Sequence, residues 1–179
     1  MPIELLVLDR RAWQQVAEDP AAFAGHHGVT FGAELEAVRV VAAQTVALLE
    51  RTGASPPWSG YLAVDWERGV IVGTCGYTAP PDPVGQVEIS YFTFPLYEGQ
   101  GYASAMARGL MDCAARAPDV RRICAHTLPK RNASARILEK LGFALTGEAI
   151  DPDAGSVWRW DCDARPGSPL AAVSNRDDG

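Results

Sequence analysis

Apolar and polar positions follow two different periods along the chain, and the two periods separate predicted strands from predicted helices. Runs that alternate or stay apolar for six to nine residues predict strands at 3–8, 61–66, 70–77, 86–94, 121–128, 143–150 and 156–163. Apolar residues at helical spacing predict helices at 10–19, 32–51, 101–117 and 132–142. This order predicts an α+β protein of three layers. We expect a mixed, mostly antiparallel sheet of six to seven strands, flanked by about four helices.

Local signals mark where the elements end. Gly53 and Pro118 stop two of the predicted helices, while Asn132 is a plausible N-cap with Gly142 just past the end of the same helix. Residues 20–30 read as a loop. We find no repeat and no linker, so residues 1–163 are predicted to form a single domain. Residues 164–179 are rich in Pro, Gly, Ser, Asn and Asp, and are predicted to be a disordered tail.

Composition and charge restrict the classes of partner that we expect for this protein. The chain has 179 residues, of which 47% are hydrophobic and 21% charged, as expected for an ordinary globular protein. The net charge is −6 with no basic block, so neither nucleic acid nor a membrane surface is an expected partner. The first residues lack the basic start of a signal peptide. No apolar run approaches the roughly 18 residues of a membrane span. We therefore expect a cytoplasmic protein.

The cysteines are not spaced for a metal or a disulfide framework. Cys75, Cys113, Cys124 and Cys162 form no Cys-x-x-Cys pair, and the chain has only three histidines. We expect four reduced thiols, mostly buried, and no metal site.

The stretch "YEGQGYAS" (97–104) lies between a predicted strand and a predicted helix. Glycines there leave the N–H groups of the helix N-terminus open to an anion such as a pyrophosphate, although a plain tight turn fits the same pattern. A P-loop would need Gly-Lys-Ser/Thr after the glycines, and a dinucleotide fingerprint would need a third glycine. Neither is present, so both nucleotide interpretations are disfavoured.

The combination of "PLYEGQGYASAMARGL", a strand, and "LPKRNASARILEKLGF" resembles the GNAT acyltransferase superfamily. Within it, the chain is most similar to the branch of ribosomal-protein N-terminal acetyltransferase-like enzymes. The resemblance is clearest over residues 60–162. It implies that acetyl-CoA is the cosubstrate, with its pyrophosphate held by the loop Glu98, Gly99, Gln100, Gly101, Tyr102 and Ala103. Relatives usually carry Arg or Gln where this chain has Glu98.

The resemblance also implies a role for the strand before the loop. That strand should kink near residues 92–94 and splay from its neighbour, so that Phe92, Thr93 and Phe94 present backbone groups to the pantetheine arm. For the side chains of Phe92 and Phe94 we expect core packing.

The helix after the last inner strand supplies the second cofactor motif that the resemblance implies, namely Asn132, Ser134 and Arg136. Helix capping explains Asn132 as well, and the two roles are compatible. Arg131, Arg136 and Lys140 could meet the 3′-phosphate, but each is also an ordinary surface charge. The tyrosine acid of many relatives falls at Leu138, so a different acid or water must act here.

Transfer to an amine needs a base that makes the amine neutral. Glu88, near the glutamate base of some relatives, is the best candidate, although a surface or salt-bridged carboxylate fits equally. His126 is a second candidate, while His26 and His27 could line the acceptor cleft. Direct transfer needs no covalent intermediate, so Cys75 and Cys124 are expected to be structural thiols. The five tryptophans suit either a cleft wall or the core.

These observations predict an acetyl-CoA-dependent N-acyltransferase, active on a protein N-terminus or a small amine, as a monomer or homodimer. The alternative is a GNAT-like module that binds acyl-CoA for sensing, without turnover.

Overall fold

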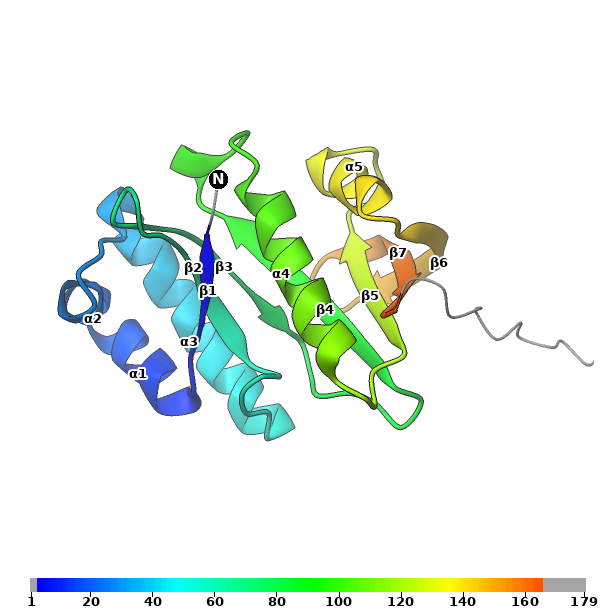
Figure 1. Ribbon diagram of the computed structural model, residues 1–179, viewed down its shortest axis with the longest axis horizontal. Helices are drawn as coiled ribbons and strands as arrows, with labels where there is room; N and C mark the ends of the chain where they lie inside the picture. The colour runs from blue at the N-terminus through cyan, green and yellow to red at the C-terminus, as the bar shows by residue number, and fades with distance from the viewer. Residues whose placement is uncertain (1–2, 166–179) are drawn as a thin grey trace, which may run out of the picture.

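A computed structural model describes residues 3–165. Seven strands form one sheet in the order β1-β2-β3-β4-β5-β7-β6, in which only β4 and β5 are parallel (Figure 1). The strands are β1 (Glu4–Val7), β2 (Gly60–Asp65), β3 (Val70–Tyr77), β4 (Gln86–Thr93), β5 (Arg122–Thr127), β6 (Ala144–Asp151) and β7 (Gly155–Asp163). The helices are α1 (Arg10–Glu18), α2 (Pro20–His26), α3 (Leu35–Thr52), α4 (Tyr102–Arg116) and α5 (Ala133–Lys140), with short 3-10 turns at Gly32–Glu34 and Pro95–Tyr97.

Helices lie on both faces of the sheet, and two glycines show which helix covers which face. A Cβ on Gly60 would meet the Trp13 ring of α1 at 2.8 Å, whereas one on Gly73 would approach Met106 of α4 at 3.1 Å. Gly60 pairs with Gly76 of β3, so these two residues point to the same face of the sheet. Gly73 lies three residues before Gly76, and side chains alternate along a strand, so Gly73 points to the opposite face from Gly60. We call the side of α1 and α3 face A, and the side of α4 face B.

The sheet is joined at its centre by a short parallel contact. β4 pairs with β5 only from Gln86 to Glu88, although β4 continues to Thr93 and stays paired with β3 over Ile89–Thr93. Beyond Glu88, no strand of the described part of the chain pairs with the outer edge of β4. The two halves of the sheet therefore part at this point, and the gap faces α4 and α5 (Figure 1).

The predicted fold class is confirmed, with seven strands and the predicted order of elements. One element was wrongly predicted: residues 20–26, expected to be loop, form α2. Asp19 accepts a hydrogen bond from the Ala22 N–H at 2.9 Å, and Pro20 occupies the first turn. The predicted tail beyond residue 165 lies outside the described residues.

Candidate active site

The outer edge of β4 is the first component of the site. The splay predicted for this strand is present, and it starts immediately after Glu88. The register with β3 is regular through Thr93, so the pairing shows no bulge at residues 92–94 where a kink was expected. Backbone groups on the open edge have no strand partner within residues 3–165, and an extended amide-bearing molecule can pair with them.

The second component is the N-terminus of α4. Gly101 caps this helix in the left-handed conformation, at φ 87°, and no side chain bonds to its first turn. The first turn therefore presents the unpaired N–H groups of Tyr102, Ala103 and Ser104, together with the positive end of the helix dipole. A Cβ on Gly101 would meet nothing within 4 Å, so the space in front of these groups is open. This geometry suits a phosphate or pyrophosphate.

A cavity of about 410 Å³ joins these two components on face B; we call it the loop cavity. Its walls come from the end of β4, the glycine loop, the start of α4 and the start of α5. The lining includes eight predicted cofactor residues: Phe92, Thr93, Glu98, Gly99, Gly101, Tyr102, Ala103 and Ser134. Four other predicted residues are not part of its wall, namely Phe94, Gln100, Asn132 and Arg136.

Two polar atoms in this cavity wall are buried and unpaired. The Tyr91 hydroxyl and Thr93 Oγ1 have no hydrogen-bond partner among the described residues. Burial raises the pKa of Tyr91 to about 12, an effect that the neighbouring Ser134 hydroxyl partly offsets. A buried hydroxyl without a partner is costly, so both atoms favour a polar ligand in the cavity. Tyr91 was not among the predicted site residues.

The glycine loop is braced from the turn between β2 and β3. Arg68 Nη1 donates to Gln100 Oε1 and to the Tyr102 hydroxyl, each at 3.1 Å, and its guanidinium lies 5.3 Å from the centre of the Tyr97 ring. The Tyr102 hydroxyl donates to Asp65 at 2.7 Å and so lowers the pKa of that carboxyl. The side chains of Gln100 and Tyr102 are thus bonded to Arg68 and hold the loop in shape.

Glu98, the unusual residue of the loop, is exposed at the mouth of the loop cavity. Its carboxylate makes no ion pair with any residue in 3–165. The charge therefore stays in water, where it is screened, while the backbone groups of the loop remain available.

The start of α5 lies beside the loop cavity, but its polar residues differ in use. Asn132 caps the helix by accepting from the Ala135 N–H at 2.9 Å, which confirms the capping interpretation. Arg131 forms a surface ion pair with Glu139 at 2.8 Å. Arg136 and Lys140 are exposed. Leu138, at the position of the relatives' tyrosine acid, is fully buried in the core.

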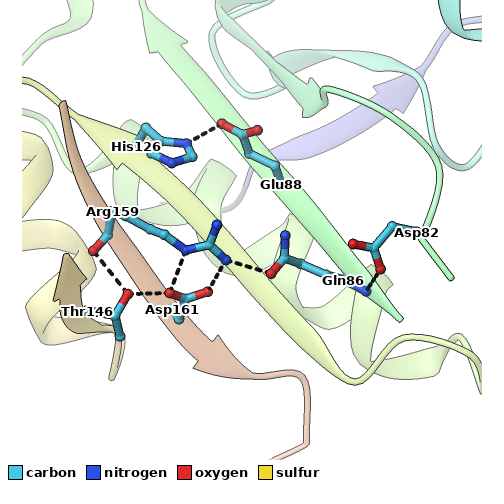
Figure 2. Close-up of polar contacts among 7 residues, drawn as sticks. All are labelled: Asp82, Gln86, Glu88, His126, Thr146, Arg159 and Asp161. Atoms are coloured by element: carbon cyan, nitrogen blue, oxygen red, sulfur yellow. Dashed lines mark hydrogen bonds and ion pairs between the residues drawn. The ribbon is translucent and has the colours of Figure 1, made fainter. Parts of the chain in front are cut away.

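Glu88 stands where β4 and β5 part, on face A. Its Oε1 lies 2.7 Å from His126 Nδ1, and its Oε2 accepts from the Thr78 hydroxyl at 3.2 Å (Figure 2). The Glu88 side chain is 33% exposed and the His126 side chain is 24% exposed, so solvent and a substrate can reach both. The two predicted base candidates are therefore neighbours, with His126 and Thr78 fixing the orientation of the carboxylate.

A second polar cluster continues along face A from the same strands (Figure 2). Arg159 donates to both oxygens of Asp161, at 2.9 and 2.8 Å, and to Gln86 Oε1 at 2.6 Å. Thr146 also donates to Asp161. Burial alone would raise the pKa of Asp161, but the hydrogen bonds from Arg159 and Thr146 outweigh it and lower the pKa. The cluster ties β6 and β7 to the start of β4.

A second cavity, also of about 410 Å³, lies on face A between α3 and strands β3 and β4; we call it the helix cavity. Ser90 and Phe92 of β4 line it, and they lie on the same face as Glu88 because side chains alternate along a strand. Tyr91 and Phe92 belong to the walls of both cavities. The two cavities thus meet at β4, one on each face.

The burial of the aromatic residues agrees only in part with the prediction. Phe94 is fully buried, as expected, but Phe92 is 44% exposed, so the core packing expected for Phe92 is wrong. The reason is the helix cavity, which leaves the Phe92 ring without a cover on face A. Trp13 is buried against Gly60 and also forms part of that cavity's wall. His26 and His27 line neither cavity and lie instead beside a separate hollow at α1 and α2.

Burial keeps three of the four thiols in their protonated form. All four cysteines are free. Burial raises the pKa of Cys75, and it raises those of Cys124 and Cys162 to about 12, which keeps these thiols protonated. Residues 3–165 contain no cluster of His, Cys, Asp or Glu suited to a metal ion. No helix in that range is long and apolar enough to cross a membrane.

Comparison with known proteins gives a family match for most of the chain. Residues 5–144 match the family described as "Acetyltransferase (GNAT) domain". The uncharacterized N-acetyltransferase YjdG of Bacillus subtilis (strain 168) is 28% identical over 104 residues, which are 58% of this chain and 62% of that one. The chain therefore matches less than two thirds of that relative's length.

Solved structures extend the likeness in fold. Ribosomal-protein-S5-alanine acetyltransferase from Vibrio fischeri superposes with a TM-score of 0.62 at 18% identity, over 93% of this chain and 96% of that one. The protein yncA from Salmonella typhimurium, solved with its cofactor acetyl-CoA, gives 0.57 at 14% identity, over 96% and 99%. At these identities the comparison shows a shared fold.

Proposed function

Because this chain belongs to the GNAT acetyltransferase family, we propose that it transfers an acetyl group from acetyl-CoA to a primary amine. The observation that supports this most is the loop cavity. It combines a helix N-terminus without a side-chain cap, the unpaired edge of β4 and two buried hydroxyls without partners among residues 3–165 in one space. A pyrophosphate, an amide-bearing arm and a polar reacting group would satisfy these three features in turn.

Different groups along the loop cavity bind different parts of acetyl-CoA. The first-turn N–H groups of Tyr102, Ala103 and Ser104 hold the pyrophosphate, and Arg68 keeps the loop in the conformation that aims them. The open edge of β4 pairs with the amides of the pantetheine arm. Ser134 lies at the far wall, beside Tyr91. Acetyl-CoA supplies the activated acetyl group as a thioester.

Proton transfer falls to Glu88 and Tyr91. Glu88 accepts a proton from the ammonium group, directly or through one water, so that the neutral nitrogen can attack the carbonyl carbon. The new C–N bond forms, the C–S bond breaks, and the sulfur takes a proton from the Tyr91 hydroxyl. Position supports this role, because the Tyr91 hydroxyl is protonated at neutral pH, has no hydrogen-bond partner among residues 3–165 and belongs to the wall of the loop cavity. It thereby replaces the acid that Leu138 cannot supply.

The test has two parts, because binding and turnover are separate claims. Acetyl-CoA at 100 times its Kd is expected to stabilise the protein by about 2.7 kcal/mol, seen as a raised Tm. Thiol release from acetyl-CoA with a panel of primary amines then measures turnover. Stabilisation without release on any amine would favour the non-catalytic module. No stabilisation near millimolar acetyl-CoA would refute both functions.

A further inference from the structure

The helix cavity has walls without charge. Its lining comes from α1, α3 and strands β2 to β4, and it contains no Asp, Glu, Lys, Arg or His. From α3, Val41, Gln44, Thr45 and Leu48 lie at helical spacing and line the cavity. The volume of about 410 Å³ suits a small organic group.

Position relates this cavity to the reaction proposed above. Glu88 lies two residues before Ser90 on the same face of β4, so the proposed base is the next side chain on that face beyond the end of the cavity. Tyr91 and Phe92 separate the cavity from the loop cavity and belong to both walls. A molecule that fills the helix cavity can therefore place its amine between Glu88 and the thioester side of β4.

We propose that the helix cavity binds the acceptor, and that this acceptor is a small primary amine with an uncharged, apolar carbon skeleton. The inference rests on the proposed function and adds the class of substrate. The wall offers no charged partner to a second ammonium or a carboxylate, whereas Trp13, Leu48 and Phe92 offer apolar contacts to a carbon skeleton. Polyamines and amino acids whose charged ends enter the cavity are therefore poor acceptors.

Three probes of equal chain length test the inference: hexylamine, 1,6-diaminohexane and 6-aminohexanoate, which differ only in the charge of the far end. The measurement is kcat/KM for thiol release from acetyl-CoA. We expect hexylamine to exceed each charged probe by about tenfold, because the wall contacts the carbon skeleton and pairs with no charge. Equal rates for the three probes would overturn the inference.

A charge placed at the cavity wall should weaken the preference. Gln44→Glu puts a carboxylate at the exposed rim of the wall, on α3, so 1,6-diaminohexane is expected to gain about threefold relative to hexylamine. Gln15→Glu is the matched control, because Gln15 is an exposed residue of α1 outside this cavity. The control should leave the ratio unchanged. A similar shift in both variants would mean that overall charge, and not the cavity, sets the preference.

Two failures can be told apart. A protein that binds acetyl-CoA and acetylates some other amine, but not hexylamine, refutes the assigned substrate class and leaves the acetyltransferase function intact. A protein that does not bind acetyl-CoA refutes the proposed function itself.

Discussion

Gly101→Ala separates the ligand role of the glycine loop from its role in folding. Gly101 has a φ of 87°, in the left-handed region, where an L-residue is strained by roughly 1–2 kcal/mol. A methyl group there meets no atom within 4 Å, so the backbone is the only source of lost stability. For a protein of this length, 1 kcal/mol lowers Tm by about 2–4 °C. The expected loss is modest, and the fold should persist.

Gly142→Ala provides a matched control. Gly142 ends α5 at a φ of 89°, also with nothing within 4 Å of an added Cβ, and it lies outside both cavities. The two variants should therefore lose similar free energies of unfolding in urea. They should differ in acetyl-CoA affinity, because only Gly101 adjoins the N–H groups proposed to hold the pyrophosphate.

The expected result in calorimetry is a Kd for acetyl-CoA that rises about tenfold or more in Gly101→Ala, equivalent to 1.4 kcal/mol, and stays constant in Gly142→Ala. Equal stability losses with unchanged affinity in both variants would refute the assignment of the loop as a phosphate site. A Gly101→Ala protein that unfolds, while Gly142→Ala does not, would show that the loop is needed for the fold.

Three further predictions concern the proton-transfer residues and the face A cluster. Glu88→Gln should lower kcat by about 10²–10⁴-fold while acetyl-CoA affinity stays constant in calorimetry; an unchanged pH–rate profile would exclude Glu88 from the reaction. Tyr91→Phe should slow thiol release without destabilising the protein in urea, because the deleted hydroxyl has no hydrogen-bond partner within residues 3–165. A loss of stability in proportion to the loss of rate would mean that the hydroxyl is structural. Asp161 has a folded pKa below its ordinary value of 3.8, so its contribution to stability is complete above that pH and disappears as the pH falls through the folded pKa. Asp161→Asn should therefore be less stable than the parent in urea at pH 7, with a smaller difference at pH 3, and a difference independent of pH would contradict this linkage.

Much of the fold was predictable because the periodic segments are long. The strands and the helices α1, α3, α4 and α5 follow from their apolar spacing and caps, and the loop from its glycines. Helix α2 was missed because its seven residues are too few to establish a period. Its start at Asp19 and Pro20 had looked like the end of α1 alone.

The site was predictable as a set of segments but not as a set of contacts. Glu88 and His126 were each candidates, yet their pairing depends on the register of two strands 38 residues apart. Tyr91 gave no signal in the sequence, because an aromatic residue in a strand is ordinarily core material. Tyr91 became a candidate only because the structure shows its hydroxyl buried without a hydrogen-bond partner among the described residues. Arg68 was overlooked for a similar reason, since a charged residue in a turn is ordinarily solvated.

The parting of β4 from β5 also has a kinetic consequence. One cavity lies on each face of the same strand, so two molecules can approach β4 from opposite sides. Neither must leave before the other arrives. If the two cavities hold the two proposed substrates, both are bound before the acetyl group is transferred, and initial-rate plots against the two substrates should intersect rather than run parallel.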